Sequence, residues 1–134
     1  MAEKLPPTVV RFVTECIHSV EQLEVLLLVR TRTSPPWTAE EVSRELRTTP
    51  DAATSRLEDL TARKLLHVAP GTSPKQYDFA PSDADTRTAI DLLAALYPAR
   101  RYSIIELIFS RPVDPIRAFA DAFRLRKDGG NDDR

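Results

Sequence analysis

Apolar positions in the N-terminal part of the chain recur at helical spacing and predict two helices. After Thr8, one helical stripe is made of Val9, Phe12, Val13, Cys16 and Ile17. Ser19, followed three residues later by Gln22, matches a capping box and starts the second helix, which covers 20–29. Because 20–29 is apolar on nearly every side, we expect it to be the buried central helix.

Polar capping residues mark the starts of two more helices. Thr38, with Glu41 three residues later, forms another capping box. Thr49 is the next N-cap, and Pro50 takes the first helical position, where its missing N–H costs nothing. The two helices cover 38–47 and 50–63, and their inward residues are Val42, Leu46, Ala53, Leu57 and Leu60.

The pattern then changes to that of a β-hairpin. Residues 65–69 are mostly apolar and read as a strand. A cluster of Pro, Gly, Ser and Thr at 70–74 is typical of a turn. Residues 75–80 alternate polar and apolar positions, so we expect them to be the returning strand.

Helical spacing returns in the C-terminal part of the chain. We expect one long helix over 83–110 that is kinked at Pro98, because proline removes a backbone donor and clashes with the preceding turn. Asp114 followed by Pro115 starts a last helix. The polar residues at 128–134 predict a disordered tail.

Three helices, a short turn between the second and third, and a hairpin form the plan of a winged helix-turn-helix. The stretches WTAEEVSREL (37–46), TPDAATSRLEDL (49–60) and RKLL (63–66) resemble bacterial winged-helix transcriptional regulators of the MarR and ArsR kind. The resemblance covers about residues 19–81. It implies that 38–47 is the support helix and 50–63 the recognition helix.

The expected fold class is therefore mostly α with a small β-hairpin. We divide the chain into an N-terminal helical arm (1–18), a winged helix-turn-helix domain (19–81), C-terminal helices (82–127) and the tail (128–134). In the resembled family, such C-terminal helices join the N-terminal helix in a two-fold dimer. The apolar stripe that supports a homodimer is Ile90, Leu93, Tyr97, Ile104, Leu107, Ile108, Phe119 and Phe123. The alternative is that these helices fold back on their own domain.

A recognition helix meets base edges with its N-terminal half, while neighbouring elements contact phosphates. The candidate DNA-binding residues are Thr38, Arg44, Thr49, Asp51, Ala52, Thr54, Ser55, Arg56, Ser73 and Lys75. Bidentate contact of Arg56 with guanine would supply about 1–3 kcal/mol of discrimination. Ser55 stands where many relatives carry arginine, so the charge of Arg56 is turned by about 100° on the helix. The alternative for Arg56 is a solvated helix face.

Charge does not decide between DNA and a protein partner. The chain has 19 Lys and Arg against 20 Asp and Glu, a net charge of −1. Residues 30–67 carry seven basic and six acidic side chains, so the expected reading head is nearly neutral, whereas 98–127 carry seven against three. A neutral head predicts modest, salt-sensitive affinity for DNA, which dimerisation would strengthen. The near-neutral head favours the alternative, a winged-helix adaptor that binds another protein.

The composition offers little for catalysis, metals or cofactors. The 134 residues suit one domain, and three glycines leave no Gly-rich phosphate loop. One cysteine and two histidines are too few for a metal site or a nucleophile, so we expect no enzyme and no cofactor. We expect Cys16 to be a small buried core residue, Trp37 a core or strand-edge plug, and His67 a residue beside the wing strand. No apolar run is long enough to span a membrane, so we expect a cytoplasmic protein.

The sequence thus predicts a dimeric, sequence-specific DNA-binding transcriptional regulator. It would occupy a pseudo-palindromic operator with the helix over 50–63 in the major groove and the hairpin at its flank. The alternative is an adaptor with the same fold that binds a protein partner and no DNA.

Overall fold

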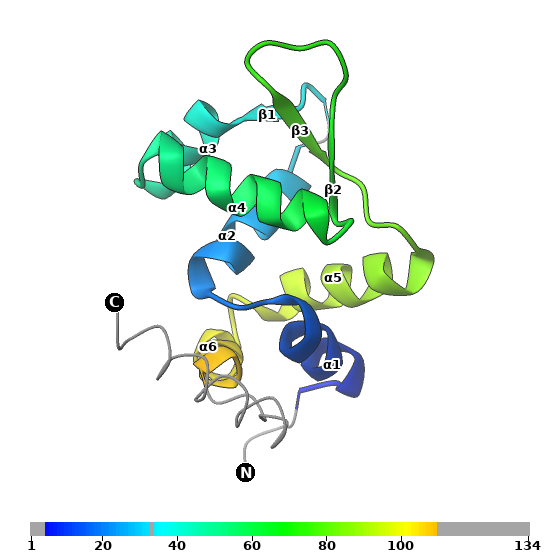
Figure 1. Cartoon of the computed structure of the whole chain (residues 1–134). Helices are drawn as coiled ribbons and strands as arrows, with labels where there is room; N and C mark the ends of the chain where they lie inside the picture. Colours follow the sequence, from blue (N-terminus) through cyan, green and yellow to red (C-terminus); the bar gives the residue numbers. More distant parts are fainter. Residues whose placement is uncertain (1–4, 33, 110–134) are drawn as a thin grey trace, which may run out of the picture.

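The structure, a computed structural model, describes residues 5–32 and 34–109 (Figure 1). Within these residues six helices and three strands follow one another: α1 (Pro7–Cys16), α2 (Val20–Arg30), β1 (Trp37–Thr38), α3 (Ala39–Leu46), α4 (Pro50–Ala62), β2 (Leu66–Val68), β3 (Gln76–Phe79), α5 (Ala84–Leu96) and α6 (Arg101–Phe109). The winged helix-turn-helix fold expected from the sequence is confirmed. The expected last helix from Asp114 and the tail at 128–134 lie outside the described residues.

Helix α2 is the central helix, as predicted. The Ser19 side chain caps it by accepting the Gln22 backbone N–H at 3.0 Å. The other half of the expected capping box differs, because the Gln22 side chain accepts the N–H of His18 rather than that of Ser19. Four apolar side chains of α2 are fully buried: Leu23, Val25, Leu26 and Val29. Helix α2 packs against α3, α4 and β3, so it supports the whole head of the molecule.

Helices α3 and α4 begin where their caps predict. Thr38 and Glu41 form a complete capping box at the start of α3. Thr49 caps α4 by accepting the N–H of Ala52 at 3.1 Å, with Pro50 in the first helical position. Arg47 ends α3 in the left-handed region (φ 57°, ψ 47°), which turns the chain sharply from α3 into α4.

The hairpin is confirmed, and it belongs to a sheet with one more strand than expected. Strands β2 and β3 pair antiparallel, and β1 pairs with the other edge of β3, giving the order β1-β3-β2. Trp37 lies opposite Tyr77 in that pairing. A two-residue strand is too short to show alternation, which is why the sequence pattern did not reveal it. Trp37 is 6% exposed, which confirms that it plugs the strand edge.

The prediction of one long kinked helix over 83–110 is wrong. Helix α5 ends at Leu96 and α6 begins at Arg101, with a turn around Pro98 between them. The N–H groups of Ala99 and Arg100 both bond to the Leu96 carbonyl, which closes the turn. Figure 1 shows α5 running across the view and α6 pointing toward the reader. Proline therefore breaks the helix here instead of bending it.

Helix α1 packs against α5 and α6, on the side of the molecule away from the wing (Figure 1). Cys16, expected in the core, is half-buried at its edge. Burial raises the pKa of the Cys16 thiol above its ordinary value. None of the helices among the described residues has the length and apolar character needed to cross a membrane.

Candidate nucleic-acid interface

Helix α4 turns one stripe of side chains to solvent. Its buried stripe is Ala53, Leu57 and Leu60, as predicted. The opposite stripe, at spacings of four and three residues, consists of the exposed residues Asp51, Ser55 and Glu58. The face that a recognition helix would present to base edges thus carries two carboxylates and one hydroxyl. Carboxylates in the major groove accept from the amino group of cytosine, whereas they repel phosphates.

Arg56 does not share that stripe. It lies on the flank of α4 that faces α2, where its Nε donates to Glu21 Oε1 at 2.9 Å. The second carboxylate oxygen of Glu21 accepts the Thr48 hydroxyl at 3.0 Å. The hydrogen bond from Arg56 is the main reason that the pKa of Glu21 lies below its ordinary value of 4.5. The guanidinium of Arg56 therefore lies to one side of the solvent-facing stripe that contains Ser55, as the sequence implied.

The other two candidate cations also have carboxylate partners. Arg44 Nη1 lies 3.3 Å from Glu40 Oε2, one turn earlier on α3. Lys75 Nζ lies 3.7 Å from Glu58 Oε2, and this pair joins the wing to α4. Both pairs are more than half exposed, so each contributes little to stability and exchanges readily with solvent ions.

The wing lies beside α4 and encloses a shallow groove with it. The groove has a volume of about 250 Å³ and opens between the start of α3, the middle of α4 and the base of the wing. Three of the candidate DNA-binding residues line it: Thr38, Thr54 and Lys75. Gly71 turns the chain at the tip with φ of 72°, a conformation that favours glycine. Ser73 is exposed in the same turn.

The remaining candidates gather at the N-terminal end of α4. Thr49 and Asp51 are exposed there, and Ala52 is partly exposed. The hydroxyl oxygens of Thr38 and Thr49 each accept a capping N–H, which leaves both hydroxyl protons available to donate. The structure therefore groups the ten candidates into a groove set, an α4 N-terminal set and four separate positions at Ser55, Arg44, Arg56 and Ser73.

Arg47 is a residue that the sequence reasoning counted for charge but did not single out. It is exposed in the turn between α3 and α4, next to the start of α4. Within 5–32 and 34–109, its guanidinium has no ion-pair partner. The sequence signal for Arg47 was its place in the short segment between two helices, just before the Thr49 cap. Connecting segments of this kind run over the protein surface, so a basic side chain there is exposed.

The described residues hold no group of three or more His, Cys, Asp or Glu side chains that is suited to a metal ion. His67 is exposed on β2 and faces Asp78 across the sheet, with 3.4 Å between Nδ1 and Oδ1. His67 therefore lies on a wing strand itself and not beside one.

Comparison with known proteins shows a likeness in structure only. No protein-family model matches the chain, and no curated protein matches it significantly. A mutant of MepR from S. aureus, solved bound to an oligodeoxyribonucleotide, is similar over 89% of this chain and 83% of its own, with 11% identity and a TM-score of 0.53. BpsR from Bordetella bronchiseptica (20% identity, 90% and 82% covered) has a TM-score of 0.49. MarR from Listeria monocytogenes (13% identity, 90% and 78% covered) has a TM-score of 0.47. The likeness to MepR shows that the two chains share a winged-helix fold.

Proposed function

We propose that this chain is a DNA-binding transcriptional regulator without enzymatic activity that acts in the cytoplasm. The observation that carries the proposal is the arrangement of α3, α4 and the wing on one side of a winged-helix fold, with the N-terminal half of α4 exposed (Figure 1). In this arrangement α4 enters the major groove and the wing lies at its flank. A similar fold has been solved with an oligodeoxyribonucleotide bound.

The ion pairs of the head determine how it meets DNA. Arg44, Arg56 and Lys75 each lie within 4.0 Å of a carboxylate oxygen. Exposed pairs of this kind are worth about 0–1 kcal/mol, so a phosphate can replace the carboxylate at small cost. Arg47 and the hydroxyls of Thr38 and Thr49 supply donors that need no such exchange. We expect modest affinity per head, with a clear dependence on salt.

Two copies of the chain would bind one operator. Helix α6 exposes two large aromatic side chains, Tyr102 at 90% and Phe109 at 77%, seven residues apart on the same face. Exposed aromatic residues at this spacing are typical of a helix that packs against another chain. A two-fold dimer places two reading heads on half-sites about one helical turn, 34–36 Å, apart. Sequence specificity would then come from Asp51 and Ser55 acting in pairs.

The second candidate function is an adaptor that binds a protein through the same face. The acidic stripe of Asp51 and Glu58 on α4 favours it, because a basic segment of a partner complements two carboxylates. Such an adaptor would bind its protein partner and would not bind duplex DNA, whatever the salt concentration or the DNA sequence.

Fluorescence anisotropy with a random-sequence duplex tests the proposal. At about 50 mM salt we expect binding that weakens steeply by about 200 mM. Arg47→Gln and Lys75→Gln should each weaken it, while Arg11→Gln, an exposed cation on α1 far from the head, should not. Absence of binding by the folded protein at low salt would reject the DNA-binding proposal and favour the adaptor.

A further inference from the structure

One carboxylate ties together two parts of the reading head. Glu21, in the first turn of α2, accepts from Arg56 of α4 with one oxygen and from Thr48 of the α3–α4 turn with the other. The two donor–acceptor distances are 3.0 Å for Thr48 and 2.9 Å for Arg56. The carboxylate thus collects a guanidinium and a hydroxyl from segments that are 27 and 35 residues away in the chain.

The donors that hold Glu21 are those that proteins use to hold a DNA phosphate. Arginine and threonine side chains make many of the backbone contacts in protein–DNA complexes. A phosphate resembles a carboxylate in charge and in offering oxygens to two donors at once. The site is at the surface, since the side chains of Arg56 and Glu21 are 38% and 34% exposed. An anion from outside can therefore reach it.

The ion pairs of the other two candidate cations lack these features. Arg44–Glu40 and Lys75–Glu58 are longer, at 3.3 and 3.7 Å, and more exposed. In each of them the carboxylate meets one cation, whereas Glu21 has a donor on both oxygens. The lowered pKa of Glu21 also keeps its carboxylate charged at neutral pH, so this internal anion is always present.

The geometry points to Thr48 and Arg56 as a binding site for a DNA backbone phosphate, occupied in the free protein by the carboxylate of Glu21. This inference rests on the proposed DNA-binding function and adds a mechanism to it. Glu21 competes with the phosphate for the same two donors. It therefore lowers the affinity for DNA. It also removes one phosphate contact from those that set the slope of log K against log salt.

The test uses Glu21→Gln, which keeps the size of the side chain and removes its charge. We expect this variant of the full chain to bind a random-sequence duplex several-fold more tightly at about 100 mM salt. The slope of log K against log salt should steepen by about 0.9, the value for one added phosphate contact. Equal or weaker binding, or an unchanged slope, would overturn the inference.

A double-mutant cycle separates displacement from a general loss of negative charge. Glu24→Gln is the matched control, because Glu24 lies three residues further along α2 and pairs with Arg101 and Tyr97 instead of the head. In an Arg56→Gln background, Glu21→Gln should change affinity no more than Glu24→Gln does. The same gain in both backgrounds would contradict the site.

Thr48→Val in the Glu21→Gln background gives an independent readout, because no carboxylate then competes for the two donors. It removes the second donor from the phosphate, so DNA binding should weaken with little change in slope, and unchanged affinity would count against the site. If neither the unmodified protein nor Glu21→Gln binds DNA at about 50 mM salt, the proposed function itself is wrong. If the unmodified protein binds and Glu21→Gln gains nothing, only the phosphate site is wrong.

Discussion

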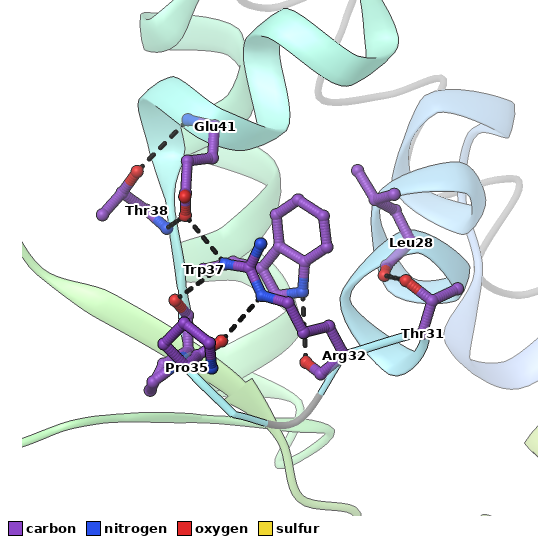
Figure 2. Close-up of polar contacts among 8 residues, drawn as sticks. Leu28, Thr31, Arg32, Pro35, Trp37, Thr38 and Glu41 are labelled. Atoms are coloured by element: carbon purple, nitrogen blue, oxygen red, sulfur yellow. Dashed lines mark hydrogen bonds and ion pairs between the residues drawn. The ribbon is translucent and has the colours of Figure 1, made fainter.

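The guanidinium of Arg32 lies over the indole ring of Trp37, 4.0 Å from its centroid. The indole N–H donates to the Arg32 carbonyl at 3.2 Å (Figure 2). Trp37 thus contacts Arg32 twice, once at the Arg32 side chain and once at the Arg32 backbone. The same guanidinium donates to the Pro35 carbonyl at 2.8 Å and to Glu41 Oε1 at 3.0 Å. This cluster fastens the end of α2 to β1 and to the capping box of α3.

Replacing Trp37 should show how much this cluster stabilises the fold. Trp37→Phe removes the indole N–H and leaves the Arg32 carbonyl without its donor, and it also leaves space in a packed site. We expect the free energy of unfolding to fall by about 1–3 kcal/mol. Urea unfolding followed by circular dichroism measures it, since the substitution removes the one tryptophan of the chain. Ser55→Ala, at an exposed position on α4, is the control and should change stability little.

The cap of the support helix is a second point of stability. Thr38→Ala removes the hydroxyl that accepts the Glu41 N–H, and the expected loss is about 1 kcal/mol. Thr88→Ala, at an exposed position inside α5, is the matched control, and it should be neutral or slightly stabilising because alanine is the better helix former. Equal effects of the two substitutions would show that the cap contributes nothing.

Glu21 and Glu41 make stability depend on pH in the acid range. Hydrogen bonds hold both pKa values below the ordinary 4.5, chiefly from Arg56 to Glu21 and from the backbone N–H of Thr38 to Glu41. A carboxyl whose pKa is lower in the folded state stabilises the fold above its unfolded pKa. That contribution is lost as pH falls through the folded value.

The measurement is the free energy of unfolding between about pH 6 and about pH 3 for the unmodified protein, Glu21→Gln and Glu41→Gln. We expect each variant to be less stable at the upper pH and the difference to shrink toward the lower one. Asp51→Asn, at an exposed position on α4, serves as the comparison. A difference that grows on acidification would contradict the direction of these pKa shifts.

Cys16 should react slowly with thiol reagents. Burial raises its pKa, so the reactive thiolate is scarce at neutral pH. A disulfide reagent such as Ellman's should modify the folded protein more slowly than the urea-unfolded chain at the same pH. Faster modification of the folded protein would indicate an activated thiol and would contradict the raised pKa.

Most of the fold could be predicted from short-range patterns in the sequence. The caps at Ser19, Thr38 and Thr49 are set by residues three positions apart, so the sequence alone located the starts of α2, α3 and α4. The hairpin followed from its alternation and its turn residues. The helix break at Pro98 was harder to foresee, because a proline bends or ends a helix according to the packing on either side of it.

The candidate site could not be predicted in full, because it depends on contacts between helices that the sequence does not show. The sequence placed Arg56 on the recognition helix and turned it from the usual position, but its partner Glu21 comes from another helix 35 residues earlier. Thr48 and Arg47 lie in a turn whose left-handed conformation is usually signalled by glycine or asparagine, and here it is formed by arginine. Sequence spacing reveals helix faces, whereas pairing between helices depends on how those helices pack.

Hydrogen exchange with and without duplex DNA tests the central claim most directly. If α4 and the wing bind DNA, amides in 47–56 and 69–76 should become better protected when duplex is added at about 50 mM salt, while those at the start of α1 and along α5 stay unchanged. An equal concentration of a neutral polymer gives the background. Protection confined to α1, α5 or α6, or no change anywhere at a concentration where anisotropy reports binding, would contradict the assignment of this face as the DNA-binding surface.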